Sequence, residues 1–271
     1  MPYATLNGHR VHYYDSKEQG LKIDNGKLPI IMIHGLGSSE NYYLPVIPLL
    51  DGHRCVAMTT YGAALSNSQG EELSLKILAE DVASLLDHLK IEQAIVAGHS
   101  MGGPMAFQVA ALHPDKVAGV VAIGPVNPSG VKPEMFTQRI ETVNKSGMEP
   151  LANTVPGAAT NKKSTHLQKA MIRELIINQD PKAYASHCEV IINMKDPGFS
   201  SIQTPVLILA GDEDQSAPME GCKAIFESIA SEMKELRVLP GVGHWHCIEA
   251  PERVAKDIAY FASALLQLAE G

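Results

Sequence analysis

The sequence predicts an α/β protein with a doubly wound, mostly parallel sheet. Short apolar runs of strand length recur along the chain, and amphipathic stretches of helix length separate them. Strands that are apolar at every position are typical of a sheet covered on both faces, and parallel strands need such crossover helices. A chain of 271 residues with 45% hydrophobic residues can bury a core of this kind.

The expected strands and helices alternate in order along the first half of the chain. Strands are expected at residues 10–15 (an edge strand, with Asn7-Gly8 as the preceding hairpin turn), 29–33, 54–58, 93–96 and 117–123. Helices are expected at residues 75–90, with Ser74 as the N-cap, and at 104–112. The pattern resumes with strands at 205–210 and 235–239 and a helix from Pro251 to about residue 268.

The alternation is interrupted between residues 124 and 204. No buried strand is expected there, and helical patterns recur at residues 133–146, 164–178 and 181–194. An insertion of this size is too long for a bare loop. We therefore expect a core formed by residues 1–123 and 205–271, with residues 124–204 as a helical cap over the site.

A candidate nucleophile lies between an expected strand and an expected helix. Ser100 is flanked by Gly98 and Gly102, which gives the pattern G-x-S-x-G. A serine in such a sharp turn needs glycine on both sides, because Cβ atoms would collide there. The following helix would point its N-terminus at an oxyanion formed beside Ser100.

The strand at residues 29–33 ends in a glycine-rich turn. Backbone N–H groups can point into a site from such a turn. We expect the N–H groups of Leu36 and Met101 to form an oxyanion hole, and His34 and Gly35 to line the site, with His34 bracing the loop through hydrogen bonds.

An activated serine needs a base and an acid that orients the base. Ser100, Asp214 and His244 each follow an expected strand, so they share one edge of the sheet. Asp212 and Glu213 compete for the acid, and His246 competes for the base. The position of Asp214 in its loop and the flexible glycines beside His244 favour the triad Ser100, Asp214 and His244.

These motifs together resemble the α/β-hydrolase superfamily. The resemblance implies that fold, with a helical cap inserted after the sixth strand, and the triad and oxyanion roles assigned above. Within the superfamily, residues 139–143, 147–152 and 180–184 are similar to the cap of 3-oxoadipate enol-lactonase-type hydrolases. This similarity implies a small lactone or ester as substrate.

One loop departs from the superfamily pattern. The family often carries Asp-x-x-Gly-x-Gly-x-Ser after the third of these strands, where this chain has Thr59, Gly62, Ala64 and Ser66. The aspartate and the second glycine are therefore absent. We expect an altered pocket shape near Tyr61.

Apolar residues of the cap are candidates to line the substrate pocket, although such a stripe equally suits the core of the cap. They suggest an uncharged substrate moiety. Together with Trp245, which follows His244, the candidates are Met135, Phe136, Ile140, Met171, Leu175, Tyr184, Cys188 and Ile191.

Charge, cysteine content and residue spacing limit the binding partners and the cellular location that we expect for this protein. A formal net charge of −8 argues against nucleic acid or an anionic membrane surface as a partner. No secretory signal or membrane-length apolar run is expected, and the scattered Cys55, Cys188, Cys222 and Cys247 suggest reduced thiols in the cytoplasm. The spacing of residues 244–247 lacks the second ligand pair of a closed zinc site, so we expect no metal and no cofactor. The sequence does not indicate an oligomeric state.

Three functional hypotheses remain open. The first is a serine hydrolase acting on a small ester or lactone. The second is C–C bond hydrolysis or cofactor-free perhydrolysis on the same scaffold. The third is a ligand sensor with slow or single turnover, because fold alone does not fix function.

Overall fold

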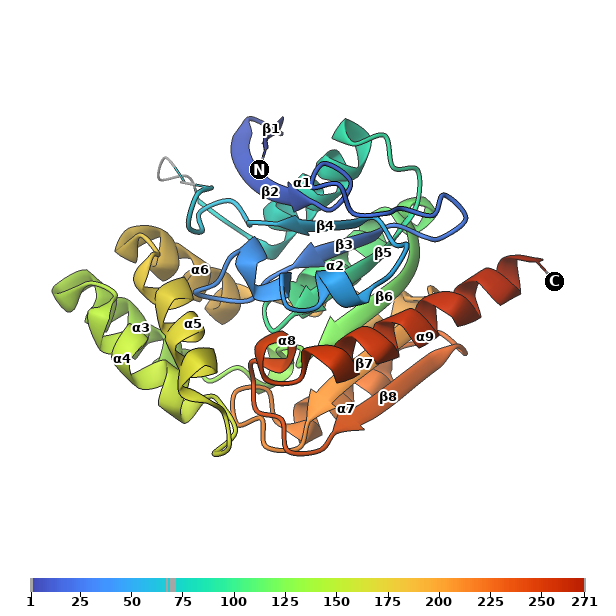
Figure 1. Ribbon diagram of the computed structural model, residues 1–271. Helices are drawn as coiled ribbons and strands as arrows, with labels where there is room; N and C mark the ends of the chain where they lie inside the picture. Colours follow the sequence, from blue (N-terminus) through green and yellow to red (C-terminus); the bar gives the residue numbers. More distant parts are fainter. Residues whose placement is uncertain (1, 67, 69–71, 271) are drawn as a thin grey trace.

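A single sheet organises the molecule. The computed structural model describes residues 2–66, 68 and 72–270. Its eight-stranded sheet has the order β1-β2-β4-β3-β5-β6-β7-β8 (Figure 1). β2 pairs antiparallel with β1 and β4, and the remaining neighbours are parallel. The doubly wound, mostly parallel sheet predicted from the sequence is confirmed.

The central strands are buried on both faces. Every residue of β3, β4, β5 and β7 is buried, as their continuous apolar sequences predict. The strands are Tyr3–Leu6 (β1), His9–Asp15 (β2), Ile30–Ile33 (β3), Cys55–Met58 (β4), Ala94–His99 (β5), Val117–Ile123 (β6), Val206–Gly211 (β7) and Lys234–Leu239 (β8).

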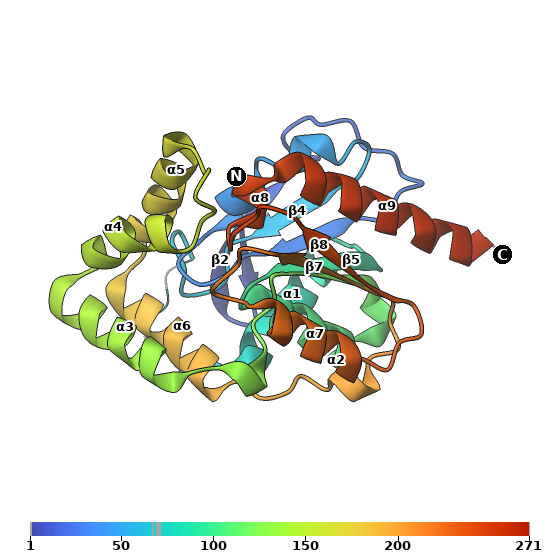
Figure 2. The same cartoon turned by 90° about the horizontal axis from the view of Figure 1, so that it is seen from below.

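Helices cover both faces of the sheet. Figure 2 shows α9 along one face and α1, α2 and α7 along the other. The core helices are Leu75–His88 (α1), Gly102–Leu112 (α2), Met219–Ser228 (α7), His246–Glu249 (α8) and Pro251–Glu270 (α9). As expected, the side chain of Ser74 caps α1, because its hydroxyl accepts the N–H of Ile77.

Helices α3 to α6 form the cap, which follows β6, the sixth strand in chain order. They are Pro133–Ser146 (α3), Glu149–Ala158 (α4), His166–Ile177 (α5) and Pro181–Asn193 (α6). α3 lies against α6, and α4 lies against α5. Both views place them to one side of the sheet (Figures 1 and 2). The division at residues 123/124 and 204/205 stays a prediction.

Three elements differ from the sequence-based expectation. The strand at residues 10–15 is not the edge, because the turn Asn7-Gly8, with φ values of 51° and 91°, folds β1 back against β2. Helix α4 was not expected, since Pro150 and Pro156 obscure its helical pattern; Pro150 lies in the first turn, where proline is tolerated. Helix α7 was also not expected.

Candidate active site

Ser100 lies in the sharp turn between β5 and α2. Its backbone φ is 54°, in the left-handed region that residues other than glycine rarely adopt. A Cβ atom on Gly98 would lie 1.9 Å from the carbonyl oxygen of Gly102, and one on Gly102 would lie 2.4 Å from that of Ile33. Glycine at both positions lets the chain turn this tightly and present the serine hydroxyl at the carboxyl edge of the sheet.

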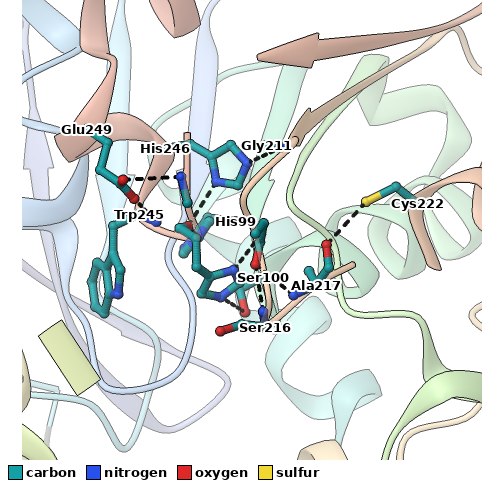
Figure 3. Close-up of polar contacts among 12 residues, drawn as sticks. His99, Ser100, Gly211, Ser216, Ala217, Cys222, Trp245, His246 and Glu249 are labelled. Carbon is teal, nitrogen blue, oxygen red and sulfur yellow. Dashed lines mark hydrogen bonds and ion pairs between the residues drawn. The ribbon is translucent and has the colours of Figure 1, made fainter. Parts of the chain in front are cut away.

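Three side chains form a continuous hydrogen-bonded chain at this edge. Nε2 of His244 lies 3.0 Å from Oγ of Ser100, and Nδ1 of His244 lies 2.8 Å from Oδ2 of Asp214. The other oxygen of Asp214 accepts the backbone N–H groups of Ser216 and Ala217, both at 2.8 Å (Figure 3). This geometry suits a base that takes the serine proton while a fixed carboxylate orients the ring.

The charge state of Asp214 fits this arrangement. Burial alone would raise the pKa of its carboxyl group, but the neighbouring His244 and further hydrogen bonds hold that pKa below its ordinary value. Asp214 is therefore ionised at neutral pH. The competing Asp212 is exposed, and its Oδ1 accepts the N–H of Gly241 at 2.6 Å, so it braces the following turn.

Two further histidines hold the backbone of His244. The carbonyl oxygen of His244 accepts Nε2–H of His99 and Nδ1–H of His246, both at 2.8 Å (Figure 3). Nε2 of His246 in turn accepts the N–H of Gly211 at 3.0 Å, which fixes the proton on Nδ1. Burial lowers the pKa of both rings, so both are neutral at pH 7. His246, the alternative candidate for the base, thus donates a hydrogen bond to the backbone of His244.

Two backbone amides beside the serine are available to an oxyanion. A Cβ atom on Gly35 would lie 2.8 Å from Cβ of Ser100, so the loop that carries Leu36 passes directly beside the candidate nucleophile. Met101 follows Ser100 in the chain. Across residues 2–66, 68 and 72–270, neither the N–H of Leu36 nor that of Met101 has a hydrogen-bond acceptor. Unpaired amides at such a turn suit a developing negative charge.

His34 braces the loop beside these amides, in the way that the sequence suggests. Its Nδ1–H donates to the carbonyl oxygen of Gly35 at 2.7 Å, and its Nε2 accepts the N–H of Thr60 at 3.0 Å. Complete burial lowers the pKa of His34 to about 4. The ring is therefore neutral and does not change its protonation state near pH 7.

A small cavity of about 50 Å³ lies between the serine and the cap. Four of the pocket candidates from the sequence line it: Met135, Phe136, Ile191 and Trp245. The remaining lining residues are Leu36, Ser100, Val126, Arg139, Val155, Ala159, Ser216 and His244.

The other pocket candidates lie elsewhere. Met171 and Leu175 line a separate cavity of about 460 Å³ beside residues 39–44, because this side of α5 does not face Ser100. Cys188 is fully buried, and Ile140 is not part of the cavity lining. Tyr184 does not line the cavity but contacts a residue that does: its hydroxyl accepts a hydrogen bond from Arg139. Which residues touch the substrate stays a prediction.

The sequence did not predict five of the lining residues, and Arg139 is the charged one among them; the others are Val126, Val155, Ala159 and Ser216. An arginine on an amphipathic helix is typical of the solvent face, so the pattern alone gives no reason to place it inward. The signal that could have found it is its position three residues after Phe136, on the same face of α3. Arg139 is half-buried beside the cavity.

A second pocket adjoins the cavity. It has a volume of about 380 Å³ and lies between the start of the cap and the loop after β7. Val126, Met135, Phe136 and Ser216 line both spaces, so the two are neighbours that share these side chains.

The loop that departs from the superfamily pattern is stabilised by a substitute carboxylate. Thr59 Oγ1 donates to Oε2 of Glu40 and accepts the N–H of Glu40 at 3.2 Å. Ala64 stands where the second glycine is absent and adopts a φ of 40°, a left-handed backbone unusual for alanine. Glu40, from the short helix Glu40–Tyr43, thus places a carboxylate beside Thr59, the position at which the sequence lacks the aspartate of the pattern.

Cys55, Cys188, Cys222 and Cys247 are buried free thiols. Within the described ranges, no three His, Cys, Asp or Glu residues are grouped so that they could hold a metal ion. A separate search of the same ranges finds no helix long and apolar enough to cross a membrane.

Comparison with known proteins agrees with the fold. The profile of the alpha/beta hydrolase fold family matches residues 29–251. The chain is 26% identical to a non-heme haloperoxidase of Rhodococcus erythropolis, over 96% of this chain and 99% of that one. It is also 26% identical to the dihydrolipoyllysine-residue acetyltransferase component of the acetoin cleaving system of Pseudomonas putida, over 87% of this chain but only 64% of that one.

A solved structure matches the whole chain. The enol-lactonase from Burkholderia xenovorans LB400 superposes with a TM-score of 0.88 at 26% identity, over 97% of this chain and 100% of that one. The chain belongs to the α/β-hydrolase family. It is a hydrolase, with relatives that include a lactonase and a haloperoxidase.

Proposed function

We propose that this protein is a serine hydrolase that cleaves a small ester or lactone through an acyl-enzyme on Ser100. The observation that carries the proposal is the hydrogen-bonded chain from Asp214 through His244 to Ser100, with two unpaired amides beside the serine. The enol-lactonase among the structural relatives, at 26% identity, supports a lactone or ester as the substrate.

The proposed reaction has two halves. His244 takes the proton of Ser100 as the hydroxyl attacks the carbonyl carbon, and Asp214 stabilises the imidazolium that forms. The N–H groups of Leu36 and Met101 hold the oxyanion of the tetrahedral intermediate. His244 then gives its proton to the leaving alcohol. A water molecule, deprotonated by His244, then attacks the acyl carbon. The bond from that carbon to Oγ of Ser100 breaks, His244 returns the proton to Oγ, and the acid product is released.

The remaining expectations from the sequence accompany this proposal. His34, Gly35, Phe136 and Trp245 are proposed to shape the substrate site. We also propose a cytoplasmic location, which the four buried thiols support.

The experiment that tests the function is steady-state hydrolysis of 4-nitrophenyl esters, simple lactones and enol-lactones, with the Ser100→Ala variant as the control. We expect multiple turnovers of short esters or lactones. The substitution should lower kcat by about 10⁴-fold or more, because it removes the nucleophile. Far-UV circular dichroism of the variant checks that the fold is retained.

Two outcomes would contradict the proposal. Substantial turnover by Ser100→Ala would show that the serine is not the nucleophile. A single stoichiometric burst with every compound, followed by no turnover, would instead favour a sensor that retains a hydrolase fold.

A further inference from the structure

The sheet ends in an open edge at β8. Among the residues that the structure describes, β8 pairs with β7 alone, and the two strands stay in unbroken parallel register along the whole of β8 (Figure 1). A regular strand at the edge of a sheet presents a row of backbone donors and acceptors to which another strand can add. We therefore asked whether the side chains of β8 favour or prevent such an addition.

The backbone groups of β8 alternate between two directions. The carbonyl oxygens of Met233 and Leu239, at odd-numbered positions, accept amides from the β7 side. Successive residues of a strand turn their backbone groups to opposite sides, so the even-numbered Lys234, Leu236 and Val238 turn theirs away from β7. In the described part of the chain, no hydrogen bond reaches the backbone groups of these three residues. Their N–H and C=O groups are free to pair with a further strand.

The usual features that protect an edge strand are missing from β8. Proline, a bulge or an outward lysine commonly prevents pairing at an edge. The segment Lys234–Leu239 contains no proline. Its lysine is turned back onto the molecule, because Nζ of Lys234 donates to the carbonyl oxygens of Phe226 at 2.9 Å and Ile229 at 2.6 Å beside α7. Val238, by contrast, is 46% exposed.

One positive and one negative side chain lie two residues apart on the opposite face of β8. Nε and Nη2 of Arg237 donate to the carboxylate of Glu235 at 2.6 and 2.8 Å, and Nη1 donates to Asp257 of α9 at 2.7 Å. These bonds use three of the five N–H groups of the guanidinium. The remaining two can donate to a further carboxylate beside the edge.

We propose that β8 pairs antiparallel with β8 of a second copy of this chain, about a two-fold axis through Leu236, so that the two sheets become continuous. In this register Glu235 lies opposite Arg237 of the partner subunit, and Lys234 lies opposite Val238 of the partner subunit. The free backbone groups of the three even-numbered residues then pair with one another. Because the contact is two-fold, each of these pairs occurs twice. The inference is independent of the proposed function.

The charges select this register over its neighbours. Moving the axis by one residue would still bring free backbone groups together, but it would place Glu235 opposite Glu235 of the partner subunit, or Arg237 opposite Arg237 of the partner subunit. Like charges directly opposite each other destabilise an antiparallel pair, whereas opposite charges stabilise it. The aliphatic stem of Lys234 can also cover the exposed Val238 of the partner subunit. The strand is therefore complementary to itself in one register.

Charge reversal with rescue in a mixture tests the proposal. Glu235→Arg makes both cross-strand pairs arginine–arginine, and Arg237→Glu makes both glutamate–glutamate. In a mixed dimer of the two variants, every reversed residue again faces the opposite charge. Sedimentation velocity between about 1 and about 200 μM, a range suited to a small interface, gives the dimer Kd. Glu141→Arg, at an exposed position of the cap helix α3, makes the same change of net charge away from β8 and is the control.

We expect wild type and Glu141→Arg to form a dimer in this range. Each reversal alone should raise Kd by about 10-fold or more, because two attractive pairs become repulsive. The equimolar mixture should associate at least as tightly as wild type, and this rescue would also show that both variants are folded. Hydrogen exchange separates strand pairing from contact through side chains only: residues 234–239 should exchange more slowly at about 200 μM than at about 1 μM in wild type, but not in Glu235→Arg.

Four results would overturn the proposal. The first is a wild-type protein that stays monomeric up to about 200 μM, the upper end of the range chosen for a weak interface. The second is a dimer whose Kd neither charge reversal changes, because another surface would then hold it. The third is a mixture that associates no better than the separate variants. The fourth is a dimer that forms without slowing hydrogen exchange in residues 234–239.

Discussion

Ser100 illustrates how a reactive residue is held in an unfavourable conformation. A left-handed backbone at a residue other than glycine costs roughly 1–3 kcal/mol. Two backbone hydrogen bonds hold this conformation in place. The N–H of Ser100 donates to the carbonyl oxygen of Ile123 at 3.0 Å, and the carbonyl oxygen of Ser100 accepts the N–H of Val126 at 3.2 Å. The stability of the sheet edge and of the first segment after β6 therefore keeps the hydroxyl in place.

At the residue scale, the structure also distinguishes two neighbouring aspartates. Asp214→Asn should lower kcat by about 10³- to 10⁴-fold, because an amide can donate to Nδ1 of His244 and favour the tautomer that cannot accept the serine proton. Asp212→Asn should have a much smaller effect, since Asp212 contacts Gly241 and not the imidazole. Kinetics of the two variants on the same ester give the comparison. Equal losses of kcat would contradict the assignment of the acid.

At the scale of elements, the loop that carries His244 is held jointly by the core and the cap. The carboxylate of Glu249 accepts the N–H groups of Trp245 at 2.9 Å (Figure 3) and Gly243 at 3.1 Å on the histidine loop. It also accepts the N–H of Asn161 at 2.7 Å, on the connection between α4 and α5. The N–H of His244 itself donates to the carbonyl oxygen of Ala159 at 2.8 Å. The cap therefore helps to position His244, the proposed base, as well as lying over the candidate site.

This connection predicts a kinetic role for Glu249 that acts through His244. In Glu249→Gln, one carboxylate oxygen becomes an NH₂ group facing backbone donors, so the histidine loop loses part of its support. We expect kcat to fall by about 10-fold or more with little change in KM, because Glu249 does not line the cavity. Glu252→Gln, an exposed change in the first turn of α9, is the matched control. An unchanged kcat, or an effect confined to KM, would contradict this role.

The sequence predicts the strand ends of the core better than it predicts the pocket formed by the cap. That Ser100, Asp214 and His244 lie together could be predicted, because each follows an expected strand and parallel strands bring their carboxyl ends to one edge. The cap pocket could not be predicted in the same way. An apolar stripe shows that one side of a helix is covered, but not what lies opposite: Met135 and Phe136 face the serine, whereas Met171 lines another cavity. Arg139 has no apolar signal, and α4 is hidden by its prolines.

At the scale of the whole molecule, burial of neutral histidines links the stability of the fold to pH. Burial lowers the pKa of His34, His99, His187 and His246, which lie at different places in the core and cap. In the unfolded chain each would titrate near the ordinary value of about 6.5. Each ring therefore binds a proton more readily unfolded than folded, and its contribution to stability is present above about pH 6.5 and decreases as the pH falls.

The free energy of unfolding should accordingly decrease steeply between about pH 6.5 and pH 4. Each buried histidine contributes up to about 1.4 kcal/mol per pH unit, which amounts to about 3 kcal/mol for His34, whose pKa is lowered to about 4. Asp81 acts in the opposite sense, because burial raises the pKa of its carboxyl group and so favours folding at low pH.

Urea titrations at pH 8, 7, 6 and 5 measure how steeply the free energy of unfolding changes with pH. His187→Gln, which removes a ring bonded to the carbonyl oxygen of Tyr61 outside the triad, should make that slope shallower, whereas His166→Gln at the exposed start of α5 should leave it unchanged. A stability that is flat from pH 7 to pH 5 would contradict the neutral state of these buried rings.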